Sequence, residues 1–310
     1  MLNKALMIAK NKRLSLIHLA VVLLLAVSNP LAAQETSNIT LSHPPRIAIV
    51  IDDLGSQLST GLRTIGLPRN GPITLAIIPF TPYGKRLAKV AYKQNNEVIL
   101  HLPMEPLGEH RPHQGMLKRS MHRDALIHTL RKAVDDIPHI SGFNNHMGSL
   151  LTQTPEHMQW IMNDISLNTS LFFLDSRTSS KSVAYETAKD TGIPSLKRDI
   201  FLDSIQSIEF VEKQFGKLMS VAIQQGYAIG IGHPYPETLL ILEKYLPILD
   251  ELGFELVSLS DILNSPTNMP YHYIARSGKA ASNNETLPSD ETFIYNHHAK
   301  LPEPEDHLHP

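Results

Sequence analysis

The chain has 310 residues, a formal net charge of −2 and no cysteine. This length suffices for one large α/β domain or two small ones. The balanced charge argues against a general nucleic-acid binder, which would carry a basic stripe, so we expect no nucleic-acid partner. The absence of cysteine excludes disulfides, thiolate metal sites and a cysteine nucleophile.

Residues 1–33 have the pattern of a secretory signal peptide. Leu14–Val27 is apolar apart from two residues and follows a basic segment formed by Lys4, Lys10, Lys12 and Arg13. The run is shorter than the ~20 apolar residues of a membrane span, and we expect cleavage near Ala33. An uncleaved signal anchor is the alternative. In both cases we expect the remainder to be exported, periplasmic or secreted, with no membrane span after cleavage.

Residues 34–45 are polar, end in two prolines and predict a short linker. From Arg46 onward, segments typical of strands alternate with segments of helical periodicity. The expected strands are Ile47–Asp52, Ile73–Ile78, Glu97–Leu102, Ile140–Asn144, Leu171–Asp175, Leu196–Ile200, Ala228–Ile231 and Glu255–Ser258. The expected helices include Arg123–Ile137, Pro155–Asn168, Ile208–Gln225 and Pro236–Leu252.

Eight β/α steps in about 215 residues, roughly 27 residues per step, predict a compact (β/α) barrel over residues 46–264. A doubly wound open sheet is the main alternative. Residues 265–310 are rich in Pro, Ser, Asn, Glu and His and lack sustained apolar periodicity, which predicts a disordered tail. The histidines of that tail could bind metal, but a solvated tail is the simpler expectation.

Two adjacent aspartates, Asp52 and Asp53, end the first expected strand just before Leu54-Gly55. The apolar run ahead of them is typical of a strand buried on both faces, and ligands collect at the carboxyl ends of such strands. Because side chains alternate along a strand, we expect the two carboxylates to point differently, so that one can hold a metal while the other takes a proton. The alternative is a turn or cap, with Asp53 capping the next helix.

Further polar residues follow the other expected strands, and in a barrel these strand ends converge on one face. They are His101, Glu105, Asn144, Asn145, His146, Asp175, Arg177 and His233. One Asp with two His forms an open site suited to Zn²⁺. A second carboxylate can then accept a proton, and a second His can protonate a leaving group. The alternatives are that His101 is a hydrogen-bonded structural residue and that Arg177 forms an ordinary ion pair with Asp175.

On these motifs, Arg46–Leu263 resembles the polysaccharide deacetylase family, specifically its divergent branch. The turn that begins at Asp52 matches the family's first motif, so the resemblance implies Asp52 as base and Asp53 as metal ligand. His233 matches the family's last motif, and Gly142–Ser149 resembles the divergent branch's own third motif. The family fold is an irregular (β/α) barrel, here expected with seven to eight strands.

The second family motif is only half present. His101 matches its first metal-binding His, but Glu105 stands where the second would be. His146 could supply the missing ligand from the neighbouring strand end, and Glu105 is its rival. Glu105 could instead hydrogen-bond to a ligating His. If neither residue compensates, the site would be metal-free and inactive.

We therefore expect an exported, Zn²⁺-dependent hydrolase that deacetylates amino sugars of an envelope or extracellular polysaccharide. The expected ligands are Asp53, His101 and His146, with Asp52 as base and His233 as acid. The residues expected to contact substrate or orient these groups are Glu105, Asn144, Asn145, Asp175 and Arg177. The alternative is a catalytically degenerate barrel that binds envelope glycans or another protein. The sequence leaves the oligomeric state open.

Overall fold

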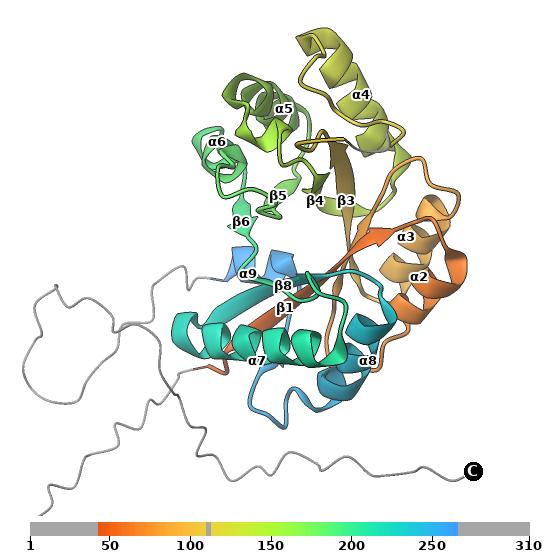
Figure 1. The fold of residues 1–310 in the computed structure, drawn as a ribbon, viewed down its shortest axis with the longest axis vertical. Coiled ribbons are helices and arrows are strands. Elements are labelled where there is room, and N and C mark those ends of the chain that lie inside the picture. Colours follow the sequence, from red (N-terminus) through yellow and green to blue (C-terminus); the bar gives the residue numbers. More distant parts are fainter. Residues whose placement is uncertain (1–42, 110–112, 266–310) are drawn as a thin grey trace, which may run out of the picture. The chain divides into compact units, whose positions relative to one another are not determined.

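A computed structural model describes residues 43–109 and 113–265 (Figure 1). The predicted signal peptide (1–33), most of the linker (34–45) and all but the first residue of the tail (265–310) lie outside the described residues. No helix within 43–109 or 113–265 has the length and apolar character that a membrane crossing requires.

One parallel sheet curls into an open barrel with helices on its outer face (Figure 1). The strand order β6-β5-β4-β3-β2-β1-β8-β7 leaves β6 and β7 as the two edges, and β9 pairs with β1 beside this path. The irregular (β/α) barrel predicted from the sequence is confirmed, with eight strands on the continuous path. The strands are β1 (Arg46–Leu54), β2 (Thr74–Ile77), β3 (Glu97–Met104), β4 (Ile140–Met147), β5 (Phe172–Asp175), β6 (Ser195–Lys197), β7 (Ile200–Phe201), β8 (Tyr227–Gly232) and β9 (Glu255–Leu256).

Helices connect most of the successive strands. Several begin or end where the sequence predicts: Pro155 is the first residue of its helix, and Gly226 ends another in the left-handed conformation, with φ 84°. The α-helices are α2 (Leu58–Ile65), α3 (Gly84–Lys93), α4 (Arg123–Asp136), α5 (Pro155–Asn168), α6 (Ala184–Asp190), α7 (Ile208–Gln225), α8 (Pro236–Tyr245) and α9 (Leu259–Asn264), and the short 3₁₀ helices are η1 (Leu151–Gln153) and η2 (Leu246–Ile248).

Two apolar clusters fill the two sides of the sheet, as the period of two along each strand requires. In β1, Ile47, Ile49 and Ile51 belong to the large cluster beneath the helices. Ala48 and Val50, which alternate with them, belong to the smaller cluster on the opposite face of β1, which also contains Leu259 and Ile262 of α9. Asp52 is the next residue on the same face of β1 as Ala48 and Val50, which is the inner face of the barrel, and it lies near the carboxyl end of the strand.

Two expected elements differ from the structure. The single strand expected over Leu196–Ile200 is two strands, because β6 pairs with β5 whereas β7 pairs with β8 on the other side of the barrel opening. The helix expected to run from Pro236 to Leu252 ends at Tyr245 and continues as η2, in which Pro247 lies in the first turn. Proline has no N–H to donate and clashes with the preceding turn, which accounts for this break.

Candidate metal centre

A bulge at the end of β1 brings both aspartates to the same cluster of histidines. The register between β1 and β2 shifts between Ile51 and Leu54, and Asp53 has a φ of 60°. Strict alternation would send Asp53 to the face opposite Asp52, but this left-handed residue turns its carboxylate back. As a result, Asp53 Oδ1 lies 3.1 Å and Asp52 Oδ2 lies 3.7 Å from His101 Nε2. The residue at the cap of α2 is Gln57, so Asp53 does not cap that helix.

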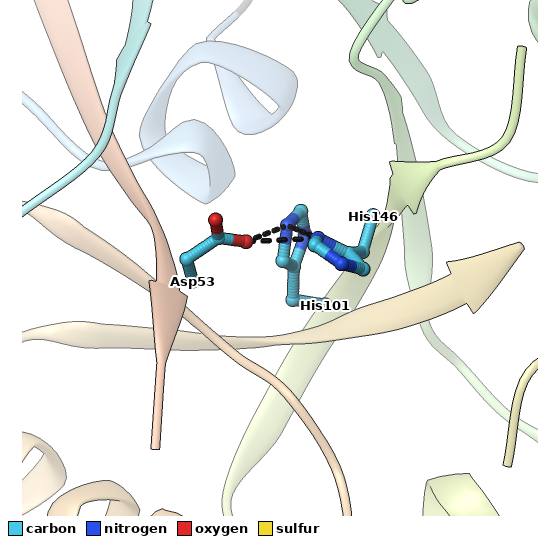
Figure 2. Close-up of side chains that lie close together, drawn as sticks. All are labelled: Asp53, His101 and His146. Carbon is cyan, nitrogen blue, oxygen red and sulfur yellow. Dashed lines mark hydrogen bonds and ion pairs between the residues drawn. The ribbon is translucent and has the colours of Figure 1, made fainter. Parts of the chain in front are cut away.

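Asp53, His101 and His146 form a compact triangle of potential ligand atoms (Figure 2). His146 Nδ1 lies 2.8 Å from Asp53 Oδ1 and 3.1 Å from His101 Nε2. Both imidazoles are buried, whereas the Asp53 side chain is one-third exposed. Among the residues that the structure describes, this is the one group of three such side chains whose ligand atoms all lie within 4.8 Å of one another.

Asn144 determines which nitrogen of His101 faces the triangle. It lies opposite His101 in the β3–β4 register, and its Oδ1 is 2.7 Å from His101 Nδ1. Since an amide oxygen only accepts, Nδ1 carries the proton, and a neutral His101 presents the lone pair of Nε2 to Asp53 and His146. One carboxylate oxygen and two imidazole nitrogens are a donor set that suits Zn²⁺, with room for a further ligand. The residues therefore fit a divalent metal.

Asp52 lies beside the triangle and is almost completely buried, with 3% exposure. Its Oδ1 accepts a hydrogen bond of 2.9 Å from the amide nitrogen of Asn144. Asn144 thus connects Asp52 to His101, because its oxygen accepts from the imidazole while its nitrogen donates to the carboxylate. Burial raises the pKa of Asp52, an effect that the nearby His101 and His233 partly offset. The carboxylate is therefore a better proton acceptor than an exposed Asp.

On the other side, His233 follows β8 with its Nε2 3.7 Å from Asp53 Oδ2. Asp203 orients this imidazole, since its Oδ1 lies 3.0 Å from Nδ1 while its Oδ2 accepts from the Thr238 hydroxyl at 2.7 Å. Burial opposes a charge on His233, but the hydrogen bond to Asp203 and the charges of Asp203 and Asp53 outweigh it and raise the pKa of His233 to about 9. His233 is therefore protonated at neutral pH.

Sequence reasoning missed Asp203, although a signal for it exists. Asp203 follows β7 by two residues, so it belongs to the same class of carboxyl-end residues as Asp52 and Asp175. The strand expected over Leu196–Ile200 ends one residue before β7 does, so Asp203 already followed it by three residues, which is the spacing between Leu102 and the selected Glu105.

The three residues of the triangle also perturb one another. Burial would raise the pKa of Asp53, but hydrogen bonds from His101 and His146 hold it well below its usual range. Burial opposes a charge on His101, yet the two aspartates raise its pKa above the ordinary value. The pKa of His146 is lowered by burial and by its proximity to His101. A metal ion in the triangle would therefore displace the proton of His101, because only a neutral imidazole is a ligand, whereas Asp53 and His146 are already in the forms that ligate.

The structure places the other predicted residues around this cluster rather than in it. Glu105 turns away from the triangle, and its Oε2 accepts the main-chain N–H of Arg119 at 2.6 Å. Between the two candidates for the third ligand, His146 is therefore the one whose ring reaches Asp53 and His101. Asn145 is buried on the opposite face of β4 from His146, where its Oδ1 accepts the N–H of Ser176.

Asp175 is buried and organises the loop after β5. Its Oδ1 accepts the main-chain N–H of Arg177 at 2.8 Å, and its Oδ2 accepts the Ser182 hydroxyl at 2.8 Å. Arg177 is exposed, with a φ of 49°, and its carbonyl accepts from Arg198 at 3.1 Å. Asp175 therefore binds the backbone of Arg177, in place of the side-chain ion pair considered from the sequence.

A cleft of about 470 Å³ opens beside the triangle. Asp53 forms part of its wall, together with the turn that leads into α2 and the segment Pro234–Pro236 after His233. Such a concave space next to perturbed titratable groups is typical of a ligand site. A ligand in this cleft would contact Asp53 directly.

Comparisons with known proteins agree with this architecture. The model of a family described as divergent polysaccharide deacetylase matches residues 49–263. The chain is 34% identical to the uncharacterized protein YibQ of Escherichia coli K12 over 248 residues, which are 80% of this chain and 73% of that protein. It is 36% identical over 225 residues to an uncharacterized protein of Haemophilus influenzae, covering 73% and 79% of the two chains. The crystal structure of the uncharacterized protein ATU2773 from Agrobacterium tumefaciens C58 has the same fold, with a TM-score of 0.68 and 24% identity over 71% of this chain and 90% of that one.

Proposed function

Since the chain belongs to the divergent polysaccharide deacetylase family, we propose that it is an exported, metal-dependent N-deacetylase. Its substrate in this proposal is an acetylated amino sugar within an envelope or extracellular polysaccharide, and the products are acetate and a free amine. The observation that supports this most directly is the triangle of Asp53, His101 and His146, with a buried carboxylate on one side and a protonated imidazole on the other.

Asp53 Oδ1, His101 Nε2 and His146 Nδ1 would hold the metal. A divalent ion bound there supplies Lewis-acid chemistry, which polarises an amide carbonyl and acidifies water. An open site with one carboxylate and two imidazoles favours Zn²⁺. The hydrogen bond from His101 Nδ1 to Asn144 keeps the His101 ring in the orientation and tautomer that ligation requires.

Asp52 is the general base in this mechanism. It accepts a proton from the water that attacks the acetamide carbonyl, so that the new C–O bond forms as the O–H bond breaks. The Asn144 amide donates to Oδ1 of Asp52, which fixes the carboxylate and leaves Oδ2 near His101 as the acceptor. Burial raises the pKa of Asp52 and so strengthens it as a base, in agreement with this role.

His233 is the general acid. Its imidazolium donates a proton to the sugar nitrogen as the C–N bond breaks, which allows the amine to leave neutral. Asp203 stabilises the charged imidazole and holds its ring by the bond to Nδ1, so that Nε2 points towards Asp53. Asp52 lies beside His101 and His233 lies beside Asp53, so one residue can take a proton from the attacking water while the other gives a proton to the departing amine.

The experiment is a measurement of acetate release from acetylated amino-sugar oligomers, with Zn²⁺ supplied, for the parent and for Asp52→Asn. Loss of a general base costs 10²–10⁴-fold in rate, and we expect a loss in this range with bound metal and thermal stability retained. The matched control is Asp190→Asn, which makes the same change at an exposed carboxylate on α6. Unchanged turnover in Asp52→Asn would contradict its role as base.

The half-present second motif, with Glu105 in place of a His, favours one competing function. If the parent released no acetate across a broad panel of glycans with Zn²⁺ bound, the protein would instead be a degenerate barrel that binds glycans or another envelope protein.

A further inference from the structure

A fourth histidine, His113, contacts the outer side of the triangle. Its Nε2 lies 3.4 Å from His146 Nε2, and the two rings meet edge to face with centroids 4.6 Å apart. His146 thus has Nδ1 directed at Asp53 and its other ring nitrogen directed at His113. His113 is half-buried and lies in the loop after β3.

We propose that His113 is a positioning residue for the metal centre, which holds His146 in the tautomer that binds metal through Nδ1. This inference rests on the proposed function only in assuming that the triangle binds a metal. His113 is not a ligand in the proposal, because it contacts the far side of the His146 ring.

In a neutral imidazole, one ring nitrogen donates a hydrogen bond and the other accepts one. To bind a metal through Nδ1, His146 must carry its proton on Nε2. A ligating His nearly always donates that second N–H to a fixed acceptor. His113 Nε2 is the acceptor that the described residues place there, and its own proton then lies on Nδ1.

In this proposal, His113 accepts a hydrogen bond from His146 in the same way that Asn144 accepts one from His101. His101 binds with Nε2 and donates from Nδ1 to Asn144, whereas His146 binds with Nδ1 and donates from Nε2 to His113. Each of the two imidazoles thus has one nitrogen in the triangle and one held by a side chain outside it. The sequence offered Glu105 as one candidate partner of a ligating His, but its carboxylate accepts a hydrogen bond from the main-chain N–H of Arg119.

One hydrogen bond within the turn and two contacts distant in sequence hold His113 in place. The carbonyl of His113 accepts from Met116 at 3.1 Å, and Leu117 donates to the carbonyl of Pro103 at 2.8 Å, which ties the loop back to β3. Between them, Gly115 has a φ of 75° and lies against the ring of Phe80, where a Cβ atom would come within 2.4 Å of that ring. The turn is therefore fixed by packing, and with it the position of His113.

The test measures metal affinity, not activity. The full chain is used with the five histidines of the tail changed to Ala, so that none of them can bind the ion: His272, His297, His298, His307 and His309. Zn²⁺ affinity is measured by competition with a chromophoric chelator, and Co²⁺ is bound in parallel to record its visible absorption spectrum. The variants are His113→Ala and His113→Gln, whose Oε1 can accept in place of the imidazole nitrogen. His128→Ala, an exposed His on α4, is the matched control, and Asn144→Ala reports the same kind of loss at His101.

We expect His113→Ala to weaken Zn²⁺ binding 10–100-fold and to change the Co²⁺ spectrum, because loss of such a partner has that effect on metal affinity. His113→Gln should restore affinity to near that of the parent, and His128→Ala should leave it unchanged. Parent-like affinity in His113→Ala would overturn the inference alone. Equal losses in His113→Ala and His113→Gln would overturn the hydrogen-bond role and leave only ring packing. A parent that binds neither ion would overturn the metal centre, and the role of His113 with it.

Discussion

The two ends of this barrel both contain carboxylates that accept several hydrogen bonds, but their partners differ. At the amino end, Glu97 at the start of β3 accepts from the hydroxyls of Thr74 and Ser260 and from the main-chain N–H groups of Leu259 and Ser260. It thereby ties the first turn of α9 to the sheet. At the carboxyl end, Asp52 and Asp53 face imidazoles and an amide.

The type of hydrogen-bond partner distinguishes a carboxylate that only stabilises the fold from one that can take part in a reaction. Main-chain N–H groups do not give up protons or bind cations, so a carboxylate that they satisfy, such as Glu97, is a cap. Imidazoles exchange protons near neutral pH and ligate metals, so a carboxylate among them can take part in a reaction. The role of a buried acid is therefore assigned only once its hydrogen-bond donors are known.

The largest effect should come from removing the Asp53 carboxylate. Asp53→Ala deletes the one anionic ligand of the triangle and leaves two imidazoles, so we expect loss of stoichiometric metal and of turnover. Elemental analysis of protein with the tail histidines replaced measures this, with Glu97→Gln as the control from the other end. Full metal retention in Asp53→Ala would remove Asp53 from the ligand set.

The next effect concerns pH. Because His233 has a pKa of about 9, its acid form persists at neutral pH, and we expect kcat/KM to fall only as pH rises through about 9. The interaction with Asp203 stabilises the fold fully below the ordinary pKa of 6.5, and this contribution is lost as pH rises through the folded value of about 9.

Asp203→Asn removes the charge that holds His233 protonated, so the alkaline limb of the pH profile should move down towards 6.5. Rate profiles of the parent and Asp203→Asn from pH 5 to 10 measure the shift. Superimposable alkaline limbs would show that His233 is not the acid.

At the amino end, we predict that substitution of Glu97 lowers the stability of the fold but leaves metal binding and turnover unchanged. Glu97→Ala leaves the first N–H groups of α9 and two hydroxyls without their acceptor, and an unsatisfied buried donor costs about 1–3 kcal/mol. Chemical denaturation should show a destabilisation of this size, while bound metal and turnover per folded molecule stay at parental levels. A Glu97→Ala protein that folds normally but has lost its metal would break the distinction between the two ends.

The smallest effect should come from an exposed ion pair that joins α2 to α8 next to the cleft. Arg63 Nη2 lies 2.9 Å from Glu243, with about half of the Arg63 side chain exposed. Solvent screens such pairs, so Arg63→Ala should change the free energy of unfolding by only ~0.2–1 kcal/mol. A larger loss in denaturation would indicate that Arg63 has a structural role beyond this pair.

Local sequence signals predict most of the fold. The helices Pro155–Asn168 and Ile208–Gln225 have the bounds expected from periodicity and terminal residues, because their caps and apolar faces are encoded within each segment. The strand break between Lys197 and Ile200 could not be read in this way. Only two residues lie between the two parts, and their pairing with β5 or β8 is what separates them.

The site is predictable in part for the same reason. Asp53, His101 and His146 each lie in the carboxyl-terminal half of a strand, and the parallel topology brings these halves together. Asn145 was expected to line the pocket, but alternation along β4 directs it to the opposite side, towards Ser176. His113 has no strand of its own and reaches His146 only through the packing of Gly115 and the return of Leu117 to β3, which are contacts distant in sequence.

The most direct test of the account is anomalous X-ray diffraction at the zinc absorption edge, from crystals of the protein grown with Zn²⁺. We predict one strong anomalous peak within bonding distance of Asp53 Oδ1, His101 Nε2 and His146 Nδ1. The absence of a peak between these three atoms, with Zn²⁺ found elsewhere in the crystal or nowhere, would contradict it.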